Sequence, residues 1–514
     1  MARPDVQCGM TAYVGAERPT FVNGHLLDVP RPPSSEKLLR DAYEVTANQM
    51  LTDNFALRWG NSGGVTHTKI TQLADAFEEA WAIYIDEEDH PLPIGADTYR
   101  LNVYIGDSGN GAPDGNGAKG YFWYDSEGWP MIVVAADTLE DPDSADITAT
   151  HELYHAIQAA TERFTYEDDS AWFWEASATW AAATVYPDNI WHASNLFAYA
   201  FLPHYPANYF NYADSTDVQD FYQYGAFILP LHLTEVAADR SLVREVWTDT
   251  GPEGDPLSVL IRLMDERGLD FNEAFLDHAA RMATLDYEQS LMYDALIDGY
   301  SEYYTESDYM VAHEVGPEGT AGLVDGPPRL APRRYGYNAI RIDPGESDTL
   351  HIEVEGDRSG SRSNLAEWGG RVVTVKGARR TYAPVVFDRN SGAATVSGLD
   401  GETVWLVVSA WTEETEDYAH ELFEYQYSVT MGGEANDGTD TDGTDKDSAP
   451  AGTDTGEADL DDDGEDTASS ELNNDREDPE ASSQRADKAG CSSVGLLTGS
   501  AWLVGLLAAA RRRR

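Results

Sequence analysis

Two histidines in the sequence are spaced as ligands of one metal ion. Residues 151–155 read His-Glu-Leu-Tyr-His, which is an HExxH motif. On an α-helix, positions i and i+4 lie about 40° apart, so the imidazoles of His151 and His155 project from one face. Glu152 then lies beside the place where a water molecule on the metal would react. The motif therefore predicts a metal site, although the same residues would also fit an ordinary helix with both histidines in the core.

A third ligand is expected because catalytic zinc sites have three protein ligands and one open position. The only cysteines, Cys8 and Cys491, stand near opposite ends of the chain, so the ligand must be a histidine or a carboxylate. Glu175 follows His155 by 20 residues, within the aromatic and alanine-rich segment 171–185. A carboxylate in such an apolar setting needs a cation as partner. We therefore expect Glu175 to bind the same ion.

Two helices must position these ligands. The first carries HExxH and continues through Ala-Ile-Gln-Ala-Ala, with Asp146 or Thr148 expected as its N-cap. The second carries Glu175 and is expected to end at Pro187.

This pattern resembles that of the gluzincin (thermolysin-like) zinc metallopeptidases, which combine HExxH with a glutamate on a following helix at this spacing. The segments HELYHAIQ and WFWEASATWAAATVYPD are most similar to the MXAN-type bacterial surface metalloproteases. The resemblance implies a zincin-like α+β catalytic domain over residues 36–305. It also implies that His151, His155 and Glu175 bind Zn²⁺ and that Glu152 is the general base.

The same resemblance raises the question of which group stabilises the oxyanion. Tyr166 follows His155 at the spacing where thermolysin-like enzymes place such a tyrosine, and Tyr224 and His232 are alternatives from a later helix. Thermolysin-like enzymes also have a carboxylate four residues after the ligand glutamate, where this chain has Thr179. We expect Thr179 to be a weaker partner for the first histidine.

Strands are expected before the first helix. Residues 55–60 and 98–106 read as strands, 66–85 as an amphipathic helix, and 121–135 as a hairpin. Zincins bind peptide against an edge strand, for which 129–135 is the first candidate and 121–124 the alternative, unless the hairpin is wholly internal. The Gly-rich loop 106–120 could bind Ca²⁺ through Asp and Asn oxygens, or be a flexible loop without metal.

The remaining segments differ in composition. Short alternating runs over residues 320–432 predict an all-β sandwich. Residues 433–490 carry 20 acidic and 4 basic residues and no aromatic residue, which predicts a disordered acidic linker. Residues 491–514 combine Cys491, an apolar helix and four arginines, and they resemble the myxobacterial MYXO-CTERM sorting tag. Residues 1–35 are expected to be a leader or propeptide-like segment, although no signal peptide is visible.

Composition limits the partners. The net charge of −57 excludes a nucleic-acid binder that works by phosphate neutralisation. The sequence therefore predicts a zinc metalloendopeptidase at the bacterial cell surface, with a protein or peptide substrate and membrane contact only through the tail. The alternative is a surface adhesin or binding protein with a non-catalytic zinc site. No motif indicates the oligomeric state.

Overall fold

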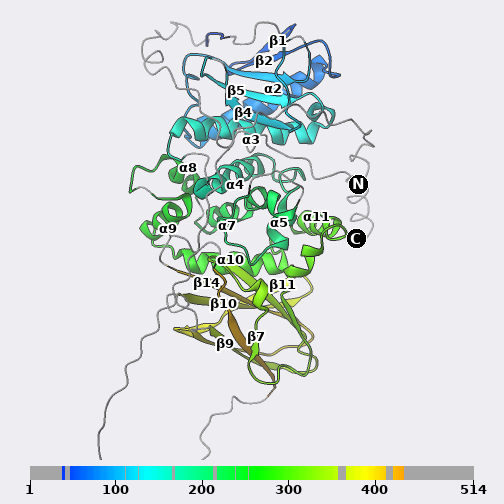
Figure 1. The fold of residues 1–514 in the computed structure, drawn as a ribbon, viewed down its shortest axis with the longest axis vertical. Helices are drawn as coiled ribbons and strands as arrows, with labels where there is room; N and C mark the ends of the chain where they lie inside the picture. The colour runs from blue at the N-terminus through cyan, green and yellow to red at the C-terminus, as the bar shows by residue number, and fades with distance from the viewer. Residues whose placement is uncertain are drawn as a thin grey trace, which may run out of the picture. The chain divides into compact units, whose positions relative to one another are not determined.

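A mixed five-stranded sheet precedes the helices that carry the HExxH motif (Figure 1). The protein was studied as a computed structural model, which describes residues 37–40, 47–109, 111–125, 127–164, 168–211, 217–237, 239–252, 254–356, 366–412 and 421–432. The strand order is β1-β2-β3-β5-β4, and the strands are β1 (Asn48–Leu51), β2 (Phe55–Trp59), β3 (Leu101–Gly106), β4 (Gly120–Tyr124) and β5 (Pro130–Ala135). Strands β2, β3 and β5 run parallel to one another, whereas β1 and β4 are antiparallel to their neighbours.

The central strands of this sheet are apolar. Every residue of β2, β3 and β5 is buried, as is typical of parallel strands. Helix α2 (His67–Trp81) starts at the N-cap Thr66 and continues into a π-helix, η2 (Ala82–Glu87). Helix α3 (Pro142–Thr161) packs against β4 and β5. The sheet therefore supports the helix that carries HExxH.

Further helices follow α3 and share one apolar core with it. They are α4 (Asp168–Val185), α5 (Leu196–Phe201), α6 (Tyr222–Gly225), α7 (Ile228–Ala237), α8 (Ser241–Thr248), α9 (Pro256–Glu266), α10 (Phe271–Thr284) and α11 (Ser290–Ser301). The 3-10 helices are η3 (Thr138–Glu140), η4 (Val218–Phe221), η5 (Thr305–Met310) and η6 (Pro328–Leu330). Helix α4 packs against α3, α6 and α7, so the second ligand helix lies within this layer.

Antiparallel sheets make up most of the last part of the described chain. The strands are β6 (His313–Val315), β7 (Val324–Asp325), β8 (Gly336–Ile342), β9 (Thr349–Gly356), β10 (Glu367–Lys376), β11 (Arg379–Pro384), β12 (Val386–Asp388), β13 (Ser391–Ser397), β14 (Thr403–Trp411) and β15 (Tyr425–Met431). One sheet has the order β11-β10-β14 and another β12-β13-β9-β15-β7, while β6 pairs with β8. A second apolar core lies between these strands.

The β10–β14 sheet also contacts the helices. Helix α10 packs against β10 and β14, as Figure 1 shows. Val373, Val407 and Trp411 from these strands belong to the core of the helical layer. All described residues fall in one compact unit, and this shared core is the reason.

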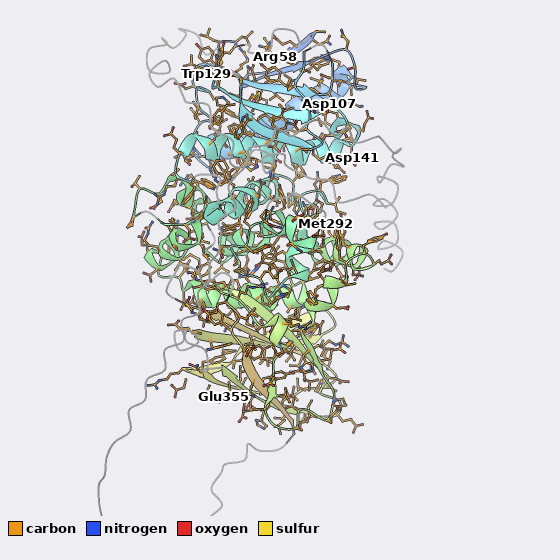
Figure 2. The ribbon with its side chains drawn as sticks, viewed as in Figure 1. Arg58, Asp107, Trp129, Asp141, Met292 and Glu355 are labelled. Carbon is orange, nitrogen blue, oxygen red and sulfur yellow. The ribbon has the colours of Figure 1, made fainter. Side chains whose placement is uncertain are left out.

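Two sequence-based expectations were wrong. Strand β5, which contains most of the predicted edge segment 129–135, is internal because it pairs with both β3 and β4. Of the two strands of this hairpin, β4, the alternative, lies at an edge of the sheet that the described residues form. The N-cap of α3 is Asp141, labelled in Figure 2, whose carboxylate accepts the backbone N–H groups of Asp143 and Ser144. Asp146 and Thr148 lie inside the helix, which starts earlier because Pro142 is favourable in its first turn.

The predicted leader (1–35), acidic linker (433–490) and sorting tail (491–514) lie outside the described residues. Within the described part of the chain, no helix is long and apolar enough to cross a membrane.

Candidate metal centre

Helices α3 and α4 bring three potential metal ligands to one point. Nε2 of His151 lies 3.0 Å from Nε2 of His155, and Oε2 of Glu175 lies 3.2 Å and 3.5 Å from these two nitrogens. Ligands about 2.0–2.1 Å from a tetrahedral zinc ion are separated from one another by about 3.3 Å. The three observed separations are close to that value, so the side chains fit one ion without rearrangement.

The chemistry of the donor set also fits a metal. A metal site needs at least three His, Cys, Asp or Glu side chains with ligand atoms close together. Among the described residues, His151, His155 and Glu175 form such a group. Two imidazoles and a carboxylate are typical zinc ligands.

Burial and the contacts among the three groups together set their charges. Burial lowers the pKa of His151 to about 4, which keeps that imidazole neutral and able to bind a metal. Burial also disfavours the cation of His155, but Glu175 raises the pKa of this imidazole above its ordinary value. For Glu175, burial opposes the charge, yet His155 and His151 hold its pKa down at about 2. The carboxylate therefore stays ionised, and a metal would compete with a proton for His155.

Each histidine has a polar partner on its other ring nitrogen. Nδ1 of His155 lies 2.6 Å from Oε1 of Gln158, and Nδ1 of His151 lies 3.4 Å from Oγ1 of Thr179. Thr179 thus occupies the place expected for it, at a distance that indicates a weak bond. Gln158 is a contact that the sequence analysis missed, although its i+3 spacing from His155 places both on one helix face.

Glu152 is buried on α3, directly after His151. Its neighbour across the helix–sheet contact is Gly120, the first residue of the edge strand β4. A β-carbon on Gly120 would lie 3.1 Å from Cγ of Glu152 and 2.6 Å from Cγ2 of Thr148. The absence of a side chain at Gly120 therefore makes room for Glu152.

The structure separates the predicted oxyanion stabilisers. Tyr224 on α6 lies beside the centre, with its ring centroid 6.4 Å from that of His151. His232 on α7 lies beside His278 of α10, at a centroid distance of 5.6 Å. Tyr166 lies outside the described residues. Tyr224 is thus the described candidate next to a ligand.

The loop proposed for Ca²⁺ uses its carboxylates within the chain. Asp107, labelled in Figure 2 at the end of β3, accepts the backbone N–H of Gly115 through Oδ2. Oδ1 of Asp114 accepts the backbone N–H of Asn116. These bonds account for the conformation of the loop, and Ca²⁺ binding there stays a prediction.

Comparisons with known proteins identify a family. A model described as a family of unknown function (DUF6055) matches residues 31–431. No curated protein matches the chain. Among solved structures, a family GH115 4-O-methyl-α-glucuronidase, BtGH115A, with specificity for decorated arabinogalactans, is 9% identical over 58% of this chain and 39% of that chain. The chain thus spans well under half of that enzyme, and the TM-score of 0.13 supports no argument about fold or function.

Proposed function

The chain belongs to the DUF6055 family, and we propose that it is a zinc-dependent metalloendopeptidase with a zincin-like catalytic domain. The observation that carries this proposal is the convergence of His151, His155 and Glu175, whose ligand atoms all lie within 4.8 Å of one another. The buried carboxylate of Glu152 is adjacent in the same helix. Three ligands with a neighbouring general base are what hydrolysis by an activated water requires.

Zinc bound there would supply positive charge that acidifies a water molecule and polarises a peptide carbonyl. Glu152 would accept a proton from the attacking water and then donate it to the departing amine nitrogen. Tyr224 would donate a hydrogen bond to the developing oxyanion. His155 is kept in its binding orientation by Gln158, and His151 more weakly by Thr179.

The edge strand β4 is the proposed binding surface for the peptide. It has β5 on one side, and no described strand pairs with its other side. A bound peptide could add to this edge through main-chain hydrogen bonds. Because a β-carbon on Gly120 of β4 would lie 3.1 Å from Cγ of Glu152, a peptide on β4 would lie close to the general base.

The cell-surface location proposed for the enzyme rests on the tail at residues 491–514, whose composition resembles a sorting tag. The acidic linker before it would separate the folded part from the point of attachment. The β-sandwich would bind substrate or a neighbouring molecule.

One observation favours a second function, a surface binding protein with a non-catalytic zinc site. The exposed fractions of His151, His155 and Glu175 are 1%, 0% and 0%. Structural zinc sites are closed, whereas catalytic sites keep one position open. A peptidase of this structure must therefore open to admit its substrate.

The test compares the full chain with Glu152→Gln, which keeps the size of the side chain and removes the base. Zinc content is measured by elemental analysis, and hydrolysis is measured on casein and on a peptide library with and without a chelator. Glu266→Gln, which changes an exposed glutamate, is the control. We expect one zinc per chain in all three proteins, and chelator-sensitive activity in all but Glu152→Gln.

Equal inactivity of the wild type and Glu152→Gln, with one zinc bound in each, would support the binding protein instead. Absence of stoichiometric zinc from the wild type would refute both proposals.

A further inference from the structure

Gln158 connects a metal-ligand candidate to the neighbouring helix. Its Oε1 lies 2.6 Å from Nδ1 of His155. Its Nε2 donates to the backbone oxygen of Trp174 and to Oγ of Ser177, both at 2.9 Å. The side chain is 1% exposed, so these bonds form away from water. Gln158 thus spans from α3 to the residue that precedes Glu175 on α4.

These contacts determine the orientation of the amide. The oxygen of Trp174 can only accept a hydrogen bond, so the group that faces it must be the NH₂ of Gln158. Oε1 of Gln158, which can only accept, then faces Nδ1 of His155. Nδ1 must therefore carry a ring proton, which leaves Nε2, the nitrogen that faces His151 and Glu175, as the one available to a metal.

A second layer holds Gln158 in this orientation. The hydroxyl of Ser177 donates to the backbone oxygen of Phe173, which leaves its lone pairs to accept. They accept from Gln158 and from Nε1 of Trp247 on α8, the latter at 3.1 Å. Ser177 and Trp247 are 0% and 2% exposed. Each polar group in this series of hydrogen bonds is therefore assigned as a donor or an acceptor.

We infer that Gln158 is a positioning residue that holds His155 in its metal-binding tautomer, and that Ser177 and Trp247 hold Gln158. This inference rests on the proposed metal centre. It adds that three helices, α3, α4 and α8, prepare the site before a metal arrives. Partners of this kind typically change metal affinity by about 10–100-fold when they are removed.

The experiment measures zinc affinity of the full chain by competition with a chromophoric chelator, and the visible spectrum of the cobalt-substituted protein. Gln158→Leu removes the acceptor for Nδ1, and we expect zinc affinity to fall about 10–100-fold and the cobalt bands to shift. Gln158→Glu keeps an acceptor for Nδ1 but, as a carboxylate, cannot donate to the oxygen of Trp174, so we expect its zinc affinity to fall less than that of Gln158→Leu.

Gln223→Leu is the matched control. Gln223 is 0% exposed and donates hydrogen bonds to two backbone oxygens, those of Asn211 and Asp220. Its substitution therefore removes buried hydrogen bonds of the same kind at a different place in the fold. We expect it to lower the thermal stability while zinc affinity and the cobalt spectrum stay unchanged. Thermal unfolding in excess chelator shows whether each variant is folded before metal is added.

Ser177→Ala is the second variant, in case Gln158→Leu does not fold. It retains the contact between Gln158 and His155 but removes one support, and we expect a smaller loss of zinc affinity, below 10-fold. Unchanged affinity and spectra in folded Gln158→Leu would overturn the inference, as would equal losses in Gln158→Leu and Gln223→Leu. If the wild type itself binds no zinc, the proposed function fails instead, and the two failures are distinguishable.

Discussion

Cγ of Glu152 lies 3.1 Å from the position that a β-carbon would take on Gly120. That separation is shorter than an ordinary van der Waals contact. The backbone oxygen of Val133 would lie 3.0 Å from the same β-carbon. A side chain at this position of the edge strand would therefore compete for space with the proposed general base.

The first prediction concerns Gly120→Ala. The added methyl group should displace Glu152 or move β4, because neither Thr148 nor the backbone of β5 can give way easily. A displacement of about 1 Å at a catalytic group can cost about 100-fold in rate. We expect peptidase activity to fall by that order while one zinc stays bound, measured by kcat/KM and elemental analysis.

Gly254→Ala is the control for this variant, since a β-carbon there would meet only Cβ of Ser258, at an ordinary 3.6 Å. It should retain full activity. Wild-type activity in Gly120→Ala would show that the contact with Glu152 has no catalytic consequence.

The second prediction concerns Glu175→Gln. The amide has nearly the same size but no charge, so the site loses its only anionic ligand. The loss of zinc affinity should exceed the roughly 100-fold upper range for residues one layer further out. Chelator competition measures it, with Asp146→Asn, a carboxylate on α3 outside the ligand group, as the control. Equal affinity in wild type and Glu175→Gln would remove this residue from the ligand set.

The three proposed ligands were predictable because the signals for them lie in short stretches of the sequence. His151 and His155 are one helical turn apart. Glu175 stands in an apolar segment, where a buried carboxylate needs a cation as partner. The hairpin of β4 and β5 was also visible, since its two strands are joined by a short turn.

Features that depend on distant pairing were not predictable. The internal position of β5 comes from its parallel pairing with β3, whose paired residues lie 29 positions earlier in the chain. The role of Gln158 depends on Ser177 and Trp247, which the fold brings to it from two other helices. The N-cap at Asp141 could have been found, because an Asp-Pro pair is a common helix start.

The third prediction concerns pH. Burial lowers the pKa of His232 to about 4, with Asp277 and Arg281 as nearby charges and the ring of His278 beside it. Because the folded pKa lies below the unfolded value of 6.5, the unfolded chain binds the proton first as pH falls. Stability is therefore full above about pH 6.5 and declines toward pH 4, by about 2 kcal/mol at pH 5 from this residue.

His232→Leu removes this titration. We expect its unfolding free energy, from urea titrations at pH 7 and pH 5, to fall about 2 kcal/mol less than that of the wild type over this interval. Parallel pH curves for the two proteins would contradict the assignment of a neutral buried imidazole.

The fourth prediction concerns the core shared by the helices and the β10–β14 sheet. The ring of Trp411 stacks on Tyr335 at 5.9 Å and 3° and belongs to the helical core. Trp411→Ala should lower the unfolding free energy by about 3–5 kcal/mol. Because the core is continuous, urea should unfold wild-type helices and sheets in one transition, followed by far-UV circular dichroism and tryptophan fluorescence. Two separate transitions in the wild type would show that the two parts are independent.

The near-complete burial of His151, His155 and Glu175 has a kinetic consequence. An ion held by enclosed side chains can leave only when the surrounding helices open, and such openings are set by local stability. Release of the ion to a chelator should therefore reach a limiting rate that no longer increases with chelator concentration. If zinc occupies this site as proposed, a competitor for zinc in solution would remove it slowly, however strongly it binds the free ion.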